Sequence, residues 1–173
     1  GLELGTVYAA LGTKVSVVEM TPGLLPGVDS DLTRVLAKNV EKIFDTIMLN
    51  TKMSSIQPNK SSIQVTFEGA EVKEATKEFE KVLIAIGRKP NSNGLGLEHT
   101  LAEIDPKGFV TVNAQRRTTD ENIYAIGDVA GEPMLAHKAA HEARVAVEAV
   151  MGHKTAFEPK AIPAVIFTDP EIA

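Results

Sequence analysis

The sequence contains no cysteine among its 173 residues. Within these residues, that absence excludes a disulfide scaffold, a thiolate metal site and thiol chemistry. Long apolar runs are missing too, since none approaches the roughly 20 residues that a helix needs to span a bilayer. A charged leader followed by an apolar stretch is also missing. We therefore expect a soluble protein that makes no membrane contact.

Positive charge is scattered along the sequence. Lys and Arg number 18 against 23 Asp and Glu, which gives a formal net charge of -5. Nucleic-acid binding requires Lys and Arg to cluster on one face or along one helix, and the sequence has no such stripe. Nucleic acid is therefore not an expected partner. Hydrophobic residues make up 43% of the chain, which is enough to build a core.

The spacing of apolar residues predicts a mixture of helices and strands. Apolar residues recur at helical spacing in three segments, with glycines or acids at their ends, over residues 1–11, 29–44 and 133–151. Shorter apolar stretches predict strands over residues 14–19 and 46–49. Alternation around a turn at residues 58–60 predicts a β-hairpin over residues 52–67.

Further strands are expected in the second half of the chain. The runs KVLIAIG (81–87) and NIYAIGD (122–128) are short, rich in β-branched residues and end near glycine, which predicts central strands buried on both faces. A loop-rich stretch, residues 88–108, separates them. One new strand is expected after Phe157. The alternation of elements indicates an α/β fold.

The opening stretch GLELGTVYAALGTKVSVVEM has the order helix, strand, acid. This order is typical of the second half of a dinucleotide-binding unit, in which a glycine-rich turn leads into a helix that binds pyrophosphate. Gly1 would be the last glycine of that turn. Glu19 would accept the ribose hydroxyls, and it follows Gly1 by 18 residues, close to the typical spacing of about 20. The alternative is that Gly1 only packs closely and Glu19 is a surface charge.

The residues around Glu19 favour NAD over NADP. A carboxylate at this position repels a 2'-phosphate, whereas an arginine just after the strand attracts it. The segment that follows Glu19 is MTPG, and the next arginine is Arg34. NAD is therefore the expected dinucleotide.

The segment TTDENIYAIGDVAGEPMLAHKAAHEA carries a second motif. Gly127 and Asp128 come at the end of an expected strand, and a helix follows them closely. This arrangement resembles the second flavin-binding motif of the pyridine nucleotide-disulfide oxidoreductases. The segments VSVVEM, AIGRKPN and IPAVIFTDPEIA agree with the same family and occur in its order. Together with PMLAHKAAHEA, they are most similar to the members that oxidise dihydrolipoyl groups.

The resemblance implies an organisation into domains. A Rossmann-like, three-layer NAD domain would cover residues 1–90, the second segment of a similar FAD domain residues 91–157, and the start of a dimer-interface domain residues 158–173. The implied cofactors are FAD and NAD. The implied protein is a homodimer whose partners are the dihydrolipoyl domains of 2-oxo acid dehydrogenase complexes. Its implied location is the cytoplasm or, in a eukaryote, the mitochondrial matrix.

The resemblance also implies that this chain holds no catalytic residue. Members of the family pass electrons through a cysteine pair, and a histidine–glutamate pair serves as their acid–base catalyst. Neither pair is matched within these residues. We therefore expect a fragment, truncated at both ends and inactive alone.

On the flavin side, the resemblance assigns Asp128 to a ribityl hydroxyl of FAD; the alternative is a helix cap or a turn acid. At the start of the following helix, Met134, Leu135, Ala136 and His137 would lie beside the isoalloxazine ring. There, backbone amides and the helix dipole stabilise negative charge on the reduced flavin.

On the NAD side, the resemblance puts Glu3 near the nicotinamide, although an acid in a first helical turn is also favourable for the dipole alone. Ala85, Gly87 and Arg88 would lie against the NAD pocket; alternatively, Gly87 only permits a turn and Arg88 is solvated. Met53 matches a position near the adenosine, but a methionine in a strand is commonly a core residue.

Two histidines raise the possibility of a metal site. His137 and His141 have the spacing of a metal pair on a helix. No third ligand follows, however, and HEARV is not the HExxH pattern, so we expect no metal site.

Two alternative functions are open at this point. A glutathione, mercuric or related disulfide reductase of the same family is one alternative function. A non-catalytic dinucleotide-binding module is another.

Overall fold

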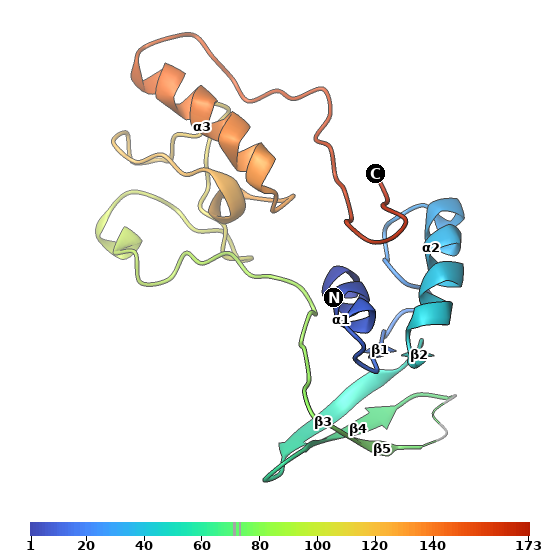
Figure 1. The fold of residues 1–173 in the computed structure, drawn as a ribbon. Helices are drawn as coiled ribbons and strands as arrows, with labels where there is room; N and C mark the ends of the chain where they lie inside the picture. The colour runs from blue at the N-terminus through green and yellow to red at the C-terminus, as the bar shows by residue number, and fades with distance from the viewer. Residues whose placement is uncertain (71, 73) are drawn as a thin grey trace. The chain divides into compact units, whose positions relative to one another are not determined.

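The computed structural model describes residues 1–70, 72 and 74–173. They form two compact units, the first comprising Gly1–Ile86 with Val165–Ala173 and the second Gly87–Ala164. The elements, in chain order (Figure 1), are α1 (Leu2–Ala10), β1 (Ser16–Val18), α2 (Ser30–Ile43), β2 (Thr46–Met48), β3 (Lys52–Pro58), β4 (Ile63–Glu68), β5 (Thr76–Phe79), the 3-10 turns η1 (Leu97–His99) and η2 (Gly127–Ala130), and α3 (Ala136–Val150). This mixture confirms the α/β class.

A parallel strand pair lies in the first unit. β1 and β2 pair with Val17 opposite Ile47, and such β-branched residues suit a pleated, half-buried surface. The Glu19 amide donates to the Met48 carbonyl at 2.9 Å, so the ladder continues one residue past β1. Because parallel strands end at the same edge of a sheet, Glu19 lies at the carboxyl edge of this pair.

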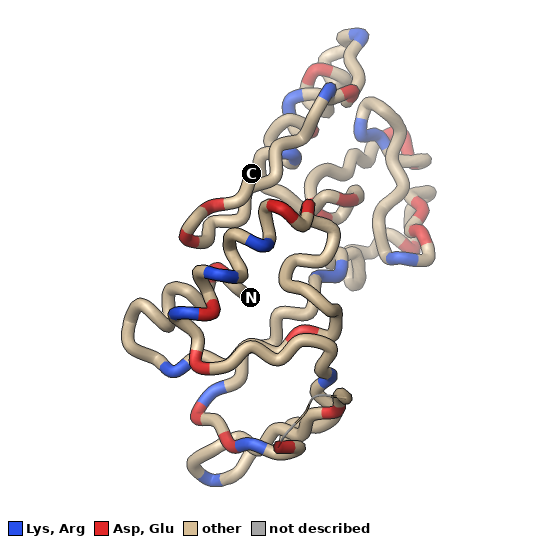
Figure 2. The backbone as a smooth tube through the Cα atoms, turned by 90° about the vertical axis from the view of Figure 1, so that its right-hand side faces the viewer, with Lys and Arg blue, Asp and Glu red and all other residues tan. Residues whose placement is uncertain are grey.

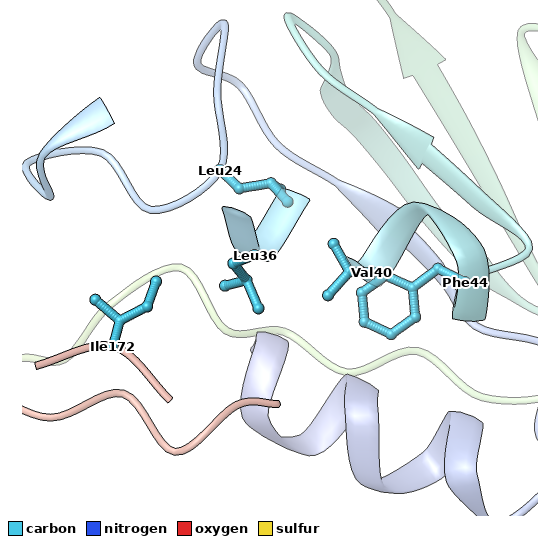
Figure 3. Packing of buried hydrophobic residues seen from close by; sticks show 5 residues of the cluster. All are labelled: Leu24, Leu36, Val40, Phe44 and Ile172. Carbon is cyan, nitrogen blue, oxygen red and sulfur yellow. The ribbon is translucent and has the colours of Figure 1, made fainter. Parts of the chain in front are cut away.

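Helix α2 supplies the core of the first unit. It begins after Asp29, as the sequence predicts. Leu36 and Val40 are four residues apart and therefore share a helix face, and both are 0% exposed. Three further buried residues complete this cluster (Figure 3), namely Leu24, Phe44 and Ile172. Burying each large side chain stabilises the unit by about 1.5–3 kcal/mol.

An antiparallel sheet of order β3-β4-β5 completes the first unit. The hairpin expected over residues 52–67 is confirmed, with Ile56 opposite Val65. β5 is not predicted by the sequence pattern, because TKEF alone has a weak strand signal. It is fixed by β4, where the rings of Phe67 and Phe79 meet edge to face with centroids 6.2 Å apart.

The second unit consists mainly of turns packed around α3. Asp105 Oδ1 accepts the amides of Lys107 at 2.8 Å and Phe109 at 2.9 Å, which fixes one tight turn. On α3, Val145 and Ala146 are buried. Among the described residues, none of the helices is long and apolar enough to cross a membrane.

The buried strand predicted over residues 81–87 is not formed. Leu83, Ile84 and Ile86 are 53%, 57% and 91% exposed. A central strand needs hydrogen-bonding neighbours on both sides, and within the described part of the chain no strand pairs with this segment. The prediction of burial was therefore wrong for these residues.

The two later strands were also predicted wrongly. Residues 123–126 contribute only an isolated bridge, Arg117–Tyr124, and the segment after Phe157 contributes another, Ile166–Ile172. The reason is the same, because a β-branched run becomes a strand only where a neighbour accepts its hydrogen bonds. Gly127 nevertheless follows residues 123–126 directly and begins η2. The predicted order of apolar run, glycine, aspartate and helix is therefore present.

Candidate functional site

The carboxylate of Glu19 is held at the carboxyl edge of β1. Its Oε1 accepts the Thr21 amide at 2.8 Å and the Thr21 hydroxyl at 2.9 Å. The Glu19 carbonyl accepts the Thr51 amide at 3.0 Å. These bonds fix the half-buried side chain, while its Oε2 takes no part in them. A fixed carboxylate oxygen at such an edge is suited to accept hydrogen bonds from a sugar diol.

The start of α1 offers backbone amides. Gly1 is the N-cap residue, and the first amides of a helix have no acceptor within it. A Cβ at Gly1 would lie 3.3 Å from the Cβ of Ala85. Glycine therefore lets the helix start pack closely on the segment before Gly87. Close packing explains this glycine by itself, and its role toward a pyrophosphate stays a prediction.

Two other residues expected on the NAD side have partners in the first unit. Glu3 Oε1 accepts the Phe167 amide at 2.9 Å, a contact that the sequence does not suggest. Met53 is half-buried in β3, opposite Phe67 in β4. The roles expected for Glu3 and Met53 toward NAD stay predictions.

Gly127 and Asp128 open η2 in the second unit. Gly127 has a φ of 74°, and a Cβ there would lie 3.0 Å from the Cβ of Ala139 on α3. The positive φ favours glycine at this position, and a Cβ would be in tight contact with α3. Asp128 is thereby presented next to α3, with its side chain 49% exposed.

Arg88 connects Asp128 to the start of α3. Its Nη1 lies 3.3 Å from Asp128 Oδ2, and its Nη2 donates to the Met134 carbonyl at 2.5 Å. Gly87, with a φ of 123°, allows the chain to turn just before Arg88. The sequence suggested a place against the NAD pocket or in solvent, whereas these contacts are with residues expected on the flavin side.

The four residues expected beside the flavin ring lie at the start of α3. Leu135 is the N-cap residue of this helix and Ala136 its first residue. Met134 is only 7% exposed, which suits packing. His137 Nε2 lies 2.7 Å from the Pro163 carbonyl. Arg88 thus links Asp128 to Met134, the residue just before the N-cap of α3.

A buried ionic cluster in the second unit is missed by the sequence reasoning. Glu142 on α3 lies within 3.0 Å of Lys138 and within 2.9 Å of Arg116. The one signal in the sequence is the i,i+4 spacing of Lys138 and Glu142, which is typical of exposed helical pairs as well. Arg116 joins them only through the tertiary fold.

Both candidate sites offer carboxylate oxygens, which accept hydrogen bonds from hydroxyl groups such as those of the two expected cofactors. Glu19 offers an acceptor for ribose hydroxyls, and Asp128 has an oxygen, Oδ1, outside its contact with Arg88. Basic and acidic side chains of the described residues are interspersed along the backbone (Figure 2). Among the described residues, no three His, Asp or Glu side chains gather as a metal site.

Comparison with known proteins gives consistent matches. The family model described as pyridine nucleotide-disulphide oxidoreductase matches residues 1–143. The chain is 45% identical to a dihydrolipoyl dehydrogenase of Haemophilus influenzae, over all of this chain and 36% of that protein. It therefore spans about a third of that relative's length.

Two solved structures match with similar coverage. LpdA from Mycobacterium tuberculosis has a TM-score of 0.86 and 30% identity, covering 98% of this chain and 36% of that one. A variant of the HOCl-induced flavoprotein disulfide reductase RclA from Escherichia coli, solved as a Cu(II) complex, has a TM-score of 0.89 and 26% identity, covering 98% of this chain and 38% of that one.

Proposed function

The chain belongs to the pyridine nucleotide-disulphide oxidoreductase family, and from this we propose that it forms the cofactor-binding part of a dihydrolipoamide dehydrogenase. The observation that carries this proposal is the 45% identity to a dihydrolipoyl dehydrogenase over the whole chain. The enzyme would reoxidise dihydrolipoyl groups of 2-oxo acid dehydrogenase complexes and pass the electrons by way of FAD to NAD. The reaction requires a cysteine pair, which these 173 residues do not contain.

In this proposal the residues of this chain bind and orient the cofactors. FAD, when bound, supplies the two-electron chemistry between the thiols and the nicotinamide. Asp128 would accept a ribityl hydroxyl, and the amides at the start of α3 would stabilise negative charge near the ring. Glu19 would accept ribose hydroxyls of NAD while the start of α1 faces the pyrophosphate.

The proposal extends to the assembly. Residues 1–90 would belong to a Rossmann-like NAD domain, residues 91–157 to the FAD domain and residues 158–173 to a dimer interface. The protein would be a homodimer that binds dihydrolipoyl domains, located in the cytoplasm of a bacterium or in the matrix of a mitochondrion.

The proposed function is tested in the full protein that carries this sequence. We expect the purified protein to show the visible absorbance of bound flavin and to reduce NAD with dihydrolipoamide. Glutathione disulfide with NADPH serves as the comparison pair of substrates. A colourless protein would contradict the flavoprotein assignment, and turnover confined to glutathione disulfide would move the protein to another branch of the family.

The Glu19→Arg substitution is expected to change the coenzyme preference. It removes the acceptor for ribose hydroxyls and adds a cation that attracts a 2'-phosphate. The ratio of kcat/KM for NAD over NADP should fall by about tenfold or more, since one lost charged hydrogen bond is worth about 1.5–3 kcal/mol. Steady-state kinetics with both coenzymes measures this ratio.

The matched control is Glu98→Arg, which makes the same charge change at an exposed residue of η1 in the other unit. The control should leave the coenzyme ratio as it is in the unmodified protein. An unchanged ratio in Glu19→Arg itself would contradict the role of this carboxylate.

A further inference from the structure

Glu142 is a buried carboxylate that faces two cations. Its Oε1 lies 3.0 Å from Lys138 Nζ and 2.9 Å from Arg116 Nη1. The side chains of Glu142 and Lys138 are 0% and 3% exposed, and that of Arg116 is 14% exposed. All three charges have therefore been removed from water almost completely.

The same cluster holds the backbone of η2 at both ends. Glu142 Oε2 accepts the Gly127 amide at 2.6 Å. Lys138 Nζ donates to the Gly131 carbonyl at 2.9 Å and approaches the Gly127 carbonyl at 3.5 Å. Asp128 lies in η2 between these two anchored glycines. The position of its carboxylate thus depends on the cluster.

Burying this ionic cluster costs free energy. Burying ions carries a desolvation penalty that well-packed apolar residues avoid. Arg116 adds two further costs, because its φ is 66° and because its Nε is buried without a hydrogen-bond partner among the described residues. The Arg116 guanidinium makes a cation–π contact with the Phe157 ring, whose centroid lies 4.8 Å from Cζ of Arg116. This contact offsets part of the cost of burying the guanidinium. These costs point to a requirement for geometry rather than for stability.

We propose that Glu142 is a positioning residue for FAD, which acts by anchoring the Gly127 amide so that Asp128 can reach the ribityl chain. Lys138 and Arg116 hold the Glu142 carboxylate in this orientation. Glu142 itself touches Gly127 and the two cations, whereas Asp128 is the residue that meets the flavin. This inference rests on the proposed function, because it concerns the same flavin site.

The test is the Glu142→Gln variant of the full protein that carries this sequence. Glutamine has the same shape, but its amide group cannot accept hydrogen bonds from all the donors that face Glu142. We expect the dissociation constant for FAD to rise about tenfold or more, as loss of one bond to a buried charge predicts. Titration of apoprotein with FAD measures the constant. The absorption spectrum of the bound flavin should also shift, because a displaced ribityl chain moves the ring that is attached to it.

The matched control is Glu148→Gln, which lies on the same helix and outside the cluster. It should keep the FAD affinity and the flavin spectrum of the unmodified protein. If Glu142→Gln also keeps both, the inference is wrong while the proposed function stands. If the unmodified protein binds no FAD, the proposed function itself fails.

A triple variant separates positioning from stability. Arg116→Met, Lys138→Met and Glu142→Met together replace the buried charges by apolar side chains, a change that is often neutral or stabilising for a fold. We expect this variant to remain folded without FAD, because the gain from removing the buried charges offsets the lost bonds to Gly127 and Gly131. It should nevertheless bind FAD at least as weakly as Glu142→Gln. A folded triple variant with unchanged FAD affinity would overturn the positioning role.

Discussion

Replacing Asp128 with alanine is expected to weaken FAD binding by about tenfold to a hundredfold, because a hydrogen bond to a charged group contributes about 1.5–3 kcal/mol. The substitution removes the acceptor proposed for a ribityl hydroxyl. It also leaves Arg88 without the carboxylate that lies 3.3 Å from its Nη1. Titration of the apoprotein with FAD, followed by flavin fluorescence, gives the dissociation constant.

A conservative variant of Asp128 and a control at another acidic residue accompany this measurement. Asp128→Asn keeps the size and one acceptor oxygen, so its loss of affinity should be smaller than that of Asp128→Ala. Asp31→Ala removes an exposed acid from the first turn of α2 and should leave FAD affinity unchanged. Equal affinities in Asp128→Ala and the unmodified protein would contradict the assignment of Asp128 to the flavin.

The Leu36→Ala substitution is expected to give the largest loss of stability in the first unit. Leu36 is 0% exposed and lies in the cluster with Val40 and Phe44. Leucine-to-alanine changes at such sites lower the free energy of unfolding by about 2–5 kcal/mol, because they lose burial and leave a cavity. Urea denaturation of the full protein, followed by circular dichroism, measures the loss as a lower midpoint.

Leu32→Ala is the matched control, because it makes the same change one turn earlier on α2. Leu32 is 41% exposed, so we expect its substitution to cost less than about 1 kcal/mol. Similar losses in the two variants would mean that α2 does not pack as the structure has it.

The elements that the sequence predicts well are those defined by local signals. Helix α2 carries an acidic start and an apolar stripe within its own 14 residues, so nothing distant is needed to recognise it. The β3–β4 hairpin likewise combines alternation with a turn between its strands. Their boundaries agree with the prediction to within a few residues.

The strands predicted wrongly depend on neighbours elsewhere. The composition of residues 81–86 is that of a central strand, but Ile86 is 91% exposed. The composition of a segment indicates whether it is suited to a buried strand. A strand forms, however, only where a neighbouring strand accepts and donates its hydrogen bonds. β5 shows the opposite case, since a weak segment becomes a strand beside β4.

The candidate functional residues also differ in whether local sequence signals reveal them. Local signals suffice to select Glu19 and Asp128 as candidates, because each follows a strand-like run and a characteristic glycine or helix; their roles stay predictions. The Glu142 cluster is not recognisable, because Arg116 lies 26 residues earlier in the chain and meets Glu142 only in the folded unit. Spacing along one helix identifies Lys138 as a neighbour of Glu142, but it does not reveal their burial.

The course of the chain between its two units has a consequence for limited proteolysis. The polypeptide leaves the first unit after Ile86 and rejoins it at Val165, and Ile172 then packs in the core beside Leu36. A single protease cut between residues 86 and 87 would therefore sever one of two connections. The two pieces should stay associated on a native gel through the core that contains Ile172, and a denaturant that opens this core should separate them.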